Sequence, residues 1–287
     1  MMQRRHQHKK PASLPQALPP APKPDPVTAP AAIQLGSADQ HELIAYLQEL
    51  GTSQDEATRI EQGIQTYIGE LSRWNPRLGL VEAEGRELLV RHVFDCLAPL
   101  PVFRALLSPL PGAHRSTLAD IGSGAGLPGL LLAIAFPDLQ VTLCERQGRR
   151  CGFLRNAAAV LRTLNAQIEE GELEKLLENN FDLVTARAFK PLEPSILLAL
   201  RRILKPDGLL VLYKGKHERI VEECTDAGLQ PLFLEGDWLV TRSGSGTTDG
   251  KTIPATKFIP APGSAVVIKL HVPELDEERH VVIVGKF

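Results

Sequence analysis

The spacing of apolar residues divides the first hundred residues into two parts. Residues 1–36 carry eight of the chain's 23 prolines and show no apolar periodicity, so we predict a disordered tail. Between residues 37 and 100, apolar residues recur at the spacing of amphipathic helices. Capping-box patterns at Ser37–Gln40 and Ser53–Glu56 mark two helix starts. Residues 37–100 therefore predict a small helical cap.

From Thr117 onward, β-rich runs alternate with helical patterns. The expected strands include 117–121, 139–145, 181–186 and 209–213, and the expected helices lie near 127–136, 147–164, 194–204 and 216–227. Such alternation predicts a parallel sheet with right-handed crossovers. The last two apolar runs, 265–272 and 280–284, have no helix between them, which predicts an antiparallel hairpin.

Residues 241–263 are rich in Gly, Ser, Thr and Pro. We predict that they form a long mobile loop inserted in a domain of residues 101–287.

Composition adds limits on compartment and partners. The formal charge is −2, so a polyanion would have to be held by a local basic patch. The four cysteines form no C-x-x-C pair, which argues against a zinc ribbon and fits a reducing compartment. No apolar run is long enough to span a bilayer, and prolines follow the basic N-terminus. We expect a cytoplasmic monomer with neither metal nor membrane attachment.

The most informative segment is Asp120–Gly129, which reads DIGSGAGLPG. It lies between a predicted strand and a predicted helix, where the carboxyl edge of a sheet opens into a ligand crevice. Its glycines allow a tight turn and a close approach of backbone to a ligand. A tight turn without any ligand is the alternative interpretation.

The residues around this loop favour one ligand class. A dinucleotide fingerprint requires glycine where Leu127 stands, and a P-loop requires Gly-Lys-Ser/Thr where Leu127-Pro128 stands. Glu145 ends the next predicted strand, where a carboxylate can accept both ribose hydroxyls of an adenosine. Asp120 adds negative charge, which suits a cationic sulfonium and would repel a pyrophosphate. We predict S-adenosylmethionine as the cofactor.

Several short motifs resemble one known family, the glucose-inhibited division protein B family of 16S rRNA guanine-N7 methyltransferases. The motifs occur in the family's order and are Leu71–Asn75, Leu89–Asp95, Asp120–Gly129, Phe153–Arg155, Ala186–Phe189, Tyr213–Gly215 and Glu278–His280. The resemblance covers roughly residues 40–235 and 264–287. It departs at Gly79–Val81, where the family has Asn-Leu-Thr, and at Cys96, where it has serine.

The resemblance implies a Rossmann-like class I methyltransferase fold of the α/β class. Its sheet would be mostly parallel and seven-stranded, with an antiparallel C-terminal hairpin and a small N-terminal helical cap. Combined with the loop, it gives as candidate cofactor contacts Asp120, Gly122, Gly124, Gly126, Leu127, Glu145, Arg146, Leu173, Glu174 and Arg187. Arg187 as an ordinary surface arginine is the alternative.

The implied substrate is a guanine in the 530 loop of small-subunit (16S) rRNA, free or within the subunit. Guanine N7 carries an in-plane lone pair and no proton, so alignment with the methyl donor suffices and no general base is needed. Consistent with this, the sequence after the fourth strand reads Arg187-Ala-Phe-Lys190 in place of the Asn/Asp-Pro-Pro-aromatic motif of amine methylation. We name no firm catalytic residue. The positioning candidates are Arg187, Lys214 and His92.

Five arginines and no acidic residue lie between Arg146 and Arg162. They either neutralise RNA phosphates or form an ordinary solvated helix face. The RNA-binding candidates are Arg149, Arg150, Arg155, Arg91, Lys216 and Arg279. His280 and a stacking Phe189 are further candidates, each with a structural alternative.

Two other functions stay open at this point. One is a methyltransferase that acts on a small molecule or a protein, which would not require the arginine-rich helix. The other is a non-catalytic ribosome assembly factor that has kept the fold.

Overall fold

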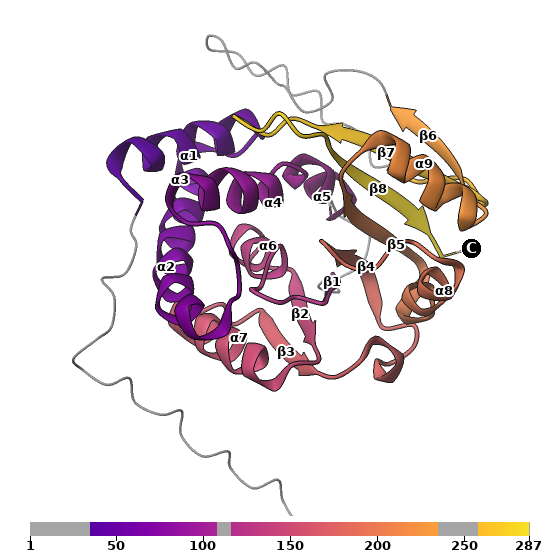
Figure 1. Ribbon diagram of the computed structural model, residues 1–287, viewed down its shortest axis with the longest axis horizontal. Coiled ribbons are helices and arrows are strands. Elements are labelled where there is room, and N and C mark those ends of the chain that lie inside the picture. Colours follow the sequence, from indigo (N-terminus) through magenta and orange to yellow (C-terminus); the bar gives the residue numbers. More distant parts are fainter. Residues whose placement is uncertain (1–34, 108–115, 235–257, 287) are drawn as a thin grey trace, which may run out of the picture. The chain divides into compact units, whose positions relative to one another are not determined.

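The predicted alternation of strands and helices builds one sheet in the computed structural model, which describes residues 35–107, 116–234 and 258–286 (Figure 1). The strands are β1 (Thr117–Ile121), β2 (Gln140–Glu145), β3 (Ala166–Glu170), β4 (Phe181–Ala186), β5 (Leu204–Lys214), β6 (Gln230–Leu234), β7 (Ser264–Leu270) and β8 (Arg279–Gly285). Their order across the sheet is β3-β2-β1-β4-β5-β8-β7-β6.

Strands β1 to β5 pair in parallel, and β8 runs antiparallel to both β5 and β7. The Rossmann-like class and the antiparallel C-terminal hairpin are therefore confirmed. The expected number of seven strands is wrong by one, because the described residues form eight. The added strand is β6, which pairs in parallel with β7 at the edge. Its Pro231 suits an edge, where one side of the strand needs no N–H donor.

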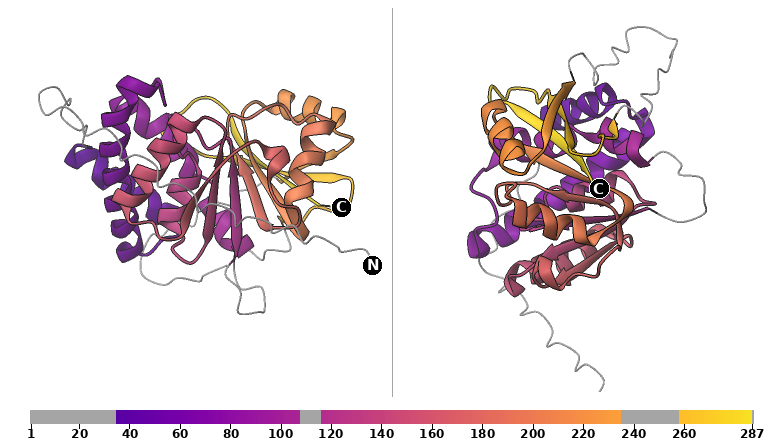
Figure 2. Two further views of the ribbon diagram at one scale, coloured as in Figure 1. Left: turned by 90° about the horizontal axis from the view of Figure 1, so that it is seen from below. Right: turned by 90° about the vertical axis from the view of Figure 1, so that its right-hand side faces the viewer.

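Helices cover both faces of the sheet (Figure 2). The helices are α1 (Ser37–Glu49), α2 (Gln54–Leu78), α3 (Gly85–Leu88), the π-helix η1 (Leu89–Phe94), α4 (Asp95–Leu97), α5 (Leu100–Leu107), α6 (Gly129–Ala135), α7 (Gly148–Leu161), the 3₁₀-helix η2 (Leu173–Lys175), α8 (Pro194–Ile203) and α9 (His217–Asp226). Helices α2, α6 and α7 contribute to one apolar core, and α8 and α9 to the other. Successive residues of one strand enter different cores, as Leu118 and Ala119 do.

One of the two predicted helix caps is present. The Ser53 hydroxyl accepts a hydrogen bond from the backbone N–H of Glu56 at 3.2 Å, as the second capping box predicted. The first prediction is wrong, because Ser37 is already helical and the cap position is Gly36, which has no side chain to offer. The residue before the cap, Leu35, is buried, and its N–H donates to the Gln65 side chain at 3.2 Å.

Two predicted segments fall largely outside the described residues. These are positions 1–34 of the predicted tail and 241–257 of the predicted loop. The described ends of both segments are packed, since Leu35 is 6% exposed and Phe258 is fully buried. Among the described helices, none is both long and apolar enough to cross a membrane.

Helix α2 holds the loop that follows β1. The buried Tyr67 hydroxyl donates to the carbonyl oxygen of Ala125 at 2.8 Å. Arg59 donates to the carbonyl oxygens of Ile134 and Ala135, at 2.5 and 3.1 Å, and so satisfies the last turn of α6. The predicted helical segment therefore positions both the glycine loop and the helix behind it.

Candidate active site

The strand order reverses between β1 and β4. In open α/β sheets, ligands bind at such a point, beyond the carboxyl ends of the strands. The loops that follow these two strands meet there. A Cβ atom added to Gly122 would lie 2.9 Å from the ring of Phe189. The glycine loop and the segment after β4 are thus in direct contact, and no side chain fits at position 122.

The three glycines of the loop have different surroundings. Gly122, Gly124 and Gly126 have φ angles of 73°, 54° and 82°, in the left-handed region that favours glycine. At Gly126 an added Cβ would clash with Leu130 at 2.5 Å, whereas at Gly124 the nearest atom would be 3.7 Å away. Packing alone therefore does not require a glycine at 124, and its bare backbone leaves room for a ligand.

Glu145 lies beneath this open backbone, as predicted. Its Oε2 accepts from the N–H of Gly124 at 3.0 Å, and its Oε1 accepts from the N–H of Gln147 at 2.9 Å. Each carboxylate oxygen can accept more than one hydrogen bond. The side chain is therefore fixed in place and keeps acceptor capacity for the two hydroxyls of a ribose.

Asp120 has a different place from the one expected. It is 1% exposed and its Oδ2 accepts from the N–H of Gly129 at 3.1 Å, so it supports the start of α6 from behind the loop. Burial raises the pKa of its carboxyl to about 7. The negative charge that we expected to favour a sulfonium is thus only partly present at neutral pH. Its Oδ1 is buried without a hydrogen-bond partner among the described residues.

The residues after β3 are mostly structural. Leu173 is 8% exposed and packs in the core, while Glu174 is exposed. Arg202 donates to the carbonyl oxygens of both residues, at 3.0 and 3.1 Å. Leu127 is buried at the start of α6, and Arg146 is exposed beside Glu145. Contacts of these four residues with a cofactor remain predictions.

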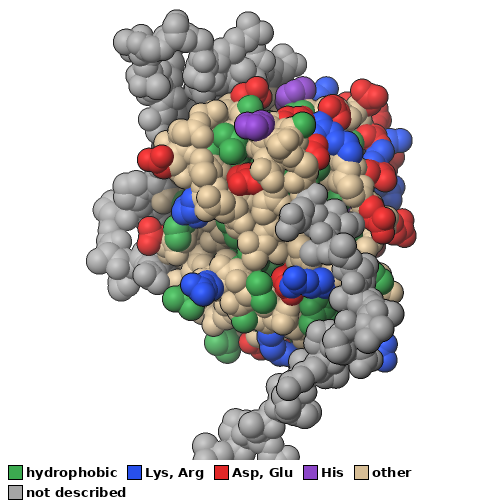
Figure 3. Space-filling view, turned by 90° about the vertical axis from the view of Figure 1, so that its left-hand side faces the viewer, with side chains coloured by type: hydrophobic (Ala, Val, Ile, Leu, Met, Phe, Trp, Pro, Cys, Tyr) green, Lys and Arg blue, Asp and Glu red, His purple; other side chains and the backbone are tan. Residues whose placement is uncertain are grey.

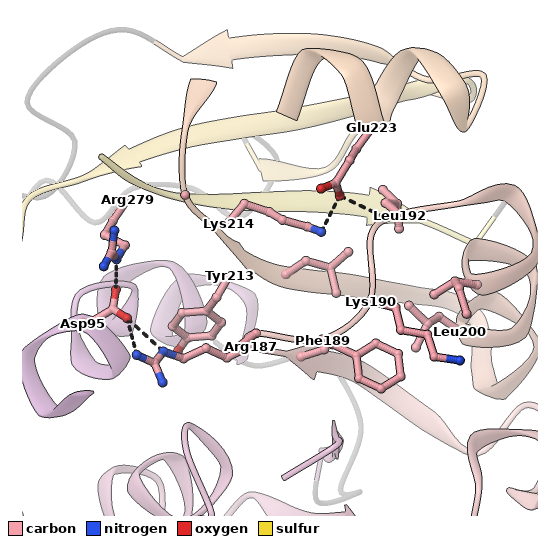
Figure 4. A pocket seen from close by; sticks show the side chains of 15 residues that line it. Asp95, Arg187, Phe189, Lys190, Leu192, Leu200, Tyr213, Lys214, Glu223 and Arg279 are labelled. Atoms are coloured by element: carbon pink, nitrogen blue, oxygen red, sulfur yellow. Dashed lines mark hydrogen bonds and ion pairs between the residues drawn. The ribbon is translucent and has the colours of Figure 1, made fainter. Parts of the chain in front are cut away.

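Arg187 is held at the carboxyl end of β4 by a buried acid (Figure 4). Its Nε donates to Asp95 Oδ2 at 2.8 Å, and its terminal nitrogen donates to the Arg91 carbonyl oxygen at 2.7 Å. Asp95 Oδ1 also pairs with Arg279 at 3.2 Å. No role was predicted for Asp95, although the Leu89–Asp95 motif contains it. This acid joins α4, the end of β4 and the start of β8.

His92 completes this group. Burial, followed by the charges of Arg187, Arg91 and Arg279, lowers the pKa of His92 to about 4, so its imidazole is neutral at pH 7. Its Nδ1 lies 3.3 Å from two guanidinium nitrogens of Arg187. A guanidinium only donates, so Nδ1 accepts and the ring proton is on Nε2. His92 orients Arg187 in the structure.

A pocket of about 320 Å³ lies beyond Arg187, between the ends of β4 and β5 and helices α8 and α9. Figure 4 shows Lys214 extending from the end of β5 toward Glu223 on α9. Their Nζ and Oε2 atoms are 2.5 Å apart. Lys214 was predicted as a positioning residue, whereas Glu223 was not, because a glutamate on an amphipathic helix is usually solvated.

The arginines of the 146–162 stretch do not form one patch. Arg149 and Arg150 lie in the first turn of α7, at the cofactor edge, and Arg150 is 3.9 Å from the Cβ position of Gly124. Arg155 is paired with Glu170 at 2.9 Å. Arg162 follows the last turn of α7 in a left-handed conformation, so it lies one helix length away from Arg149 and Arg150. Arg162 therefore lies apart from the arginines at the cofactor edge, and RNA contacts of Arg149, Arg150 and Arg155 remain predictions.

The other RNA-binding candidates differ in whether their side chains form ion pairs with acidic residues. Arg91 pairs with Glu87 and Glu277, and Arg279 pairs with Asp95. Lys216 is exposed and has no ion pair within the described ranges. His280 is 3% exposed and its Nδ1 donates to the Gly215 carbonyl oxygen at 2.6 Å, so its role is structural. On the face in Figure 3, basic and acidic side chains are interspersed.

Comparison with known proteins decides the family. The family model described as GidB, rRNA small subunit methyltransferase G, matches residues 60–234. The chain belongs to this family. The Ribosomal RNA small subunit methyltransferase G of Treponema denticola is 32% identical over 272 residues, which cover 85% of this chain and 93% of that protein. The Halorhodospira halophila protein of the same name is 38% identical over 57% of this chain and 72% of its own length. The resemblance seen in the motifs is thus confirmed.

The chain also resembles solved methyltransferase structures at low sequence identity. A SAM dependent methyltransferase from Aquifex aeolicus is 19% identical with a TM-score of 0.37, over 48% of this chain and 82% of that one. A likeness of this size carries no argument about function.

Proposed function

We propose that this protein transfers a methyl group from S-adenosylmethionine to N7 of a guanine in the 530 loop of 16S rRNA. Membership of the rRNA small subunit methyltransferase G family supports the reaction class and the RNA substrate. The position of the methylated atom rests on the motif resemblance and on the chemistry of the pocket. The working compartment would be the cytoplasm and the partner 16S rRNA or the small ribosomal subunit.

The observation that carries the proposal is the contact between two half-sites, one for the cofactor and one for the base. Gly124 with Glu145 forms a cradle that fits the nucleoside part of the cofactor. The pocket that Phe189 lines has a volume of about 320 Å³, which leaves room for a single base. Since Phe189 touches Gly122, the two half-sites adjoin at the switch point of the sheet. The arrangement brings a bound base next to a bound donor, which is the main requirement for methyl transfer to N7.

The side chains in the pocket also agree with a reaction that needs no general base. When bound, S-adenosylmethionine supplies an electrophilic methyl group. Arg187 is held cationic by Asp95, and Lys214 is paired with Glu223. His92 is neutral but its Nδ1 faces Arg187. These groups can orient a base and exclude water, and N7 attacks with its own lone pair.

A labelling experiment tests the proposal. Purified protein is incubated with 16S rRNA lacking the modification, or with small subunits, and with methyl-labelled S-adenosylmethionine, and N7-methylguanine is mapped by mass spectrometry. We expect one labelled guanine in the 530 loop. Label in a protein or small molecule would support the broader methyltransferase alternative. Cofactor binding without any transfer would support an assembly factor, and either result would contradict the proposal.

A further inference from the structure

The ion pair between Lys214 and Glu223 lines the pocket and is shielded from solvent on both sides. The Lys214 side chain is 16% exposed and that of Glu223 is 13% exposed. A shielded pair contributes little net stability, because the desolvation of two charges offsets their attraction. Packing therefore does not explain why a binding pocket contains it.

Each partner retains hydrogen-bonding capacity. Glu223 Oε2 accepts from Lys214 Nζ and from the backbone N–H of Leu192, at 2.5 and 2.9 Å. Its Oε1 makes no hydrogen bond within the described ranges, and Arg219 Nε lies 3.9 Å from it. The Lys214 ammonium has three N–H donors and uses one of them on Glu223. The pair thus offers an acceptor and a donor side by side.

This arrangement complements one edge of guanine. The edge of guanine presents the O6 acceptor followed by the N1–H and N2–H₂ donors, whereas adenine presents an N6–H₂ donor in the place of O6. We propose that Lys214 donates to O6 and Glu223 Oε1 accepts from N1–H and N2–H₂, so that the pair selects guanine at the methylation site. The inference rests on the proposed function and names the residues that recognise its substrate base.

The positions of the two residues also fit the direction of the reaction. Glu223 belongs to α9, at the end of the pocket away from Phe189, which contacts the glycine loop (Figure 4). A guanine whose N1 and N2 face Glu223 has its N7 on the opposite side of the ring. N7 would therefore point toward the Phe189 end, where the cofactor cradle begins. The contacts with Lys214 and Glu223 would thus both select guanine and direct its N7 toward the cofactor.

Inosine separates the role of Glu223 from that of Lys214, because this base keeps O6 and N1–H and lacks the N2 amine. The substrate is a 16S rRNA fragment that carries guanine or inosine at the position mapped by mass spectrometry. For the unaltered protein we expect inosine to lower kcat/KM about 10- to 100-fold, the range for losing a hydrogen bond to a charged group. In Glu223→Gln we expect a lower rate on guanine and an inosine penalty of only about fivefold, because the amide oxygen still accepts from N2–H₂ but carries no charge.

Lys214→Gln should lower kcat/KM on both bases by the same factor, since both carry O6. Glu222→Gln, an exposed neighbour on α9 that pairs with Arg219, should behave as the unaltered protein. Thermal unfolding and S-adenosylmethionine binding are measured for each variant, and we expect both to be retained. Lys214→Gln also serves as the second test where Glu223→Gln fails to fold.

Two negative results have different meanings. If the unaltered protein methylates guanine but Glu223→Gln keeps the full inosine penalty, the reading of N2 by Glu223 is wrong and the proposed function stands. A Lys214→Gln variant with an unchanged rate on guanine would likewise overturn the role of Lys214. If the unaltered protein binds the cofactor and labels no RNA, the proposed function fails and this inference falls with it.

Discussion

Burial sets the charge of two side chains beside the site in opposite directions. Asp120 is enclosed behind the glycine loop, and burial raises the pKa of its carboxyl to about 7. His92 is enclosed next to cations, and burial together with those cations lowers its pKa to about 4. At neutral pH, Asp120 is therefore partly protonated and His92 is neutral, and both affect how stability depends on pH.

We expect Asp120→Asn to remove a fall in stability between about pH 4 and pH 7. In that window the unfolded carboxyl, with an ordinary pKa of 3.8, has lost its proton, while the folded one, with a pKa of about 7, keeps it. The folded state binds more protons, so unfolding free energy decreases as pH rises, by on the order of 4 kcal/mol.

Denaturant titrations of both proteins from pH 4 to pH 8 measure the difference. Asparagine can still accept from the N–H of Gly129, so the fold is kept. His92 changes stability in the opposite direction between about pH 4 and 6.5 and is present in both proteins. If the unfolding free energies of the two proteins change with pH in parallel, the pKa of Asp120 is not raised in the folded state.

Gly124→Ala and Gly129→Ala form a pair with different expected defects. An alanine Cβ at 124 has space, with its nearest atom at 3.7 Å, so the variant folds with a strain of about 1 kcal/mol from its positive φ. It occupies the approach to the cofactor, and we expect the Kd for S-adenosylmethionine to rise at least tenfold. At 129 the Cβ would lie 2.3 Å from Leu143. There we expect a loss of about 1–3 kcal/mol of stability.

Calorimetry measures the cofactor affinity of each variant, and thermal unfolding measures its stability. Normal cofactor affinity in Gly124→Ala would place the pocket elsewhere.

Among the elements, α4, β4 and β8 converge on one acid. Asp95 is 5% exposed and pairs with Arg187 and Arg279. Removing it leaves two arginines with uncompensated charge, so we expect Asp95→Ala to lose about 3–5 kcal/mol of unfolding free energy. Glu277→Ala, which breaks an exposed pair with Arg91, should leave the melting temperature nearly unchanged. Equal melting temperatures for the two variants would contradict this account of the cluster.

At this scale the sequence predicted most of the sheet, because buried parallel strands read as short apolar runs between helical patterns. It missed β6, whose five residues are only partly covered and include a proline. It also placed the first helix cap one residue late. The chain before this helix is held by a hydrogen bond from the N–H of Leu35 to Gln65, thirty positions away. Such long-range contacts leave no local pattern.

The whole molecule carries a formal charge of −2, so binding of RNA must depend on a small region. Arg149 and Arg150 lie at the cofactor edge, and Arg162 lies at the far end of α7. We expect Arg149→Ala to weaken RNA binding and to reduce the slope of log K against log salt by about 0.7 for one lost contact to single-stranded phosphate. Arg162→Ala is the matched control and should leave both quantities unchanged. Equal effects of the two would place the RNA surface elsewhere; filter binding over a salt series makes the comparison.

The site as a whole was only partly predictable. The glycine loop and Glu145 follow from local motifs, because a tight turn and a strand-end carboxylate have fixed places in this fold. Asp95 and Glu223 could not be assigned roles, since their functions depend on partners brought together by folding. Asp120 shows the reverse case, a motif residue whose side chain turns inward to Gly129.

The hydrogen bond from Tyr67 to Ala125 makes the cofactor loop depend on a helix that lies outside the sheet. Whenever α2 detaches transiently, the loop loses this support, and only the closed fraction of molecules is competent to bind. The observed dissociation constant is then the intrinsic one divided by that fraction. If α2 detaches before the sheet unfolds, cofactor affinity falls first on heating or in mild urea, and donor binding then reports on the N-terminal helices.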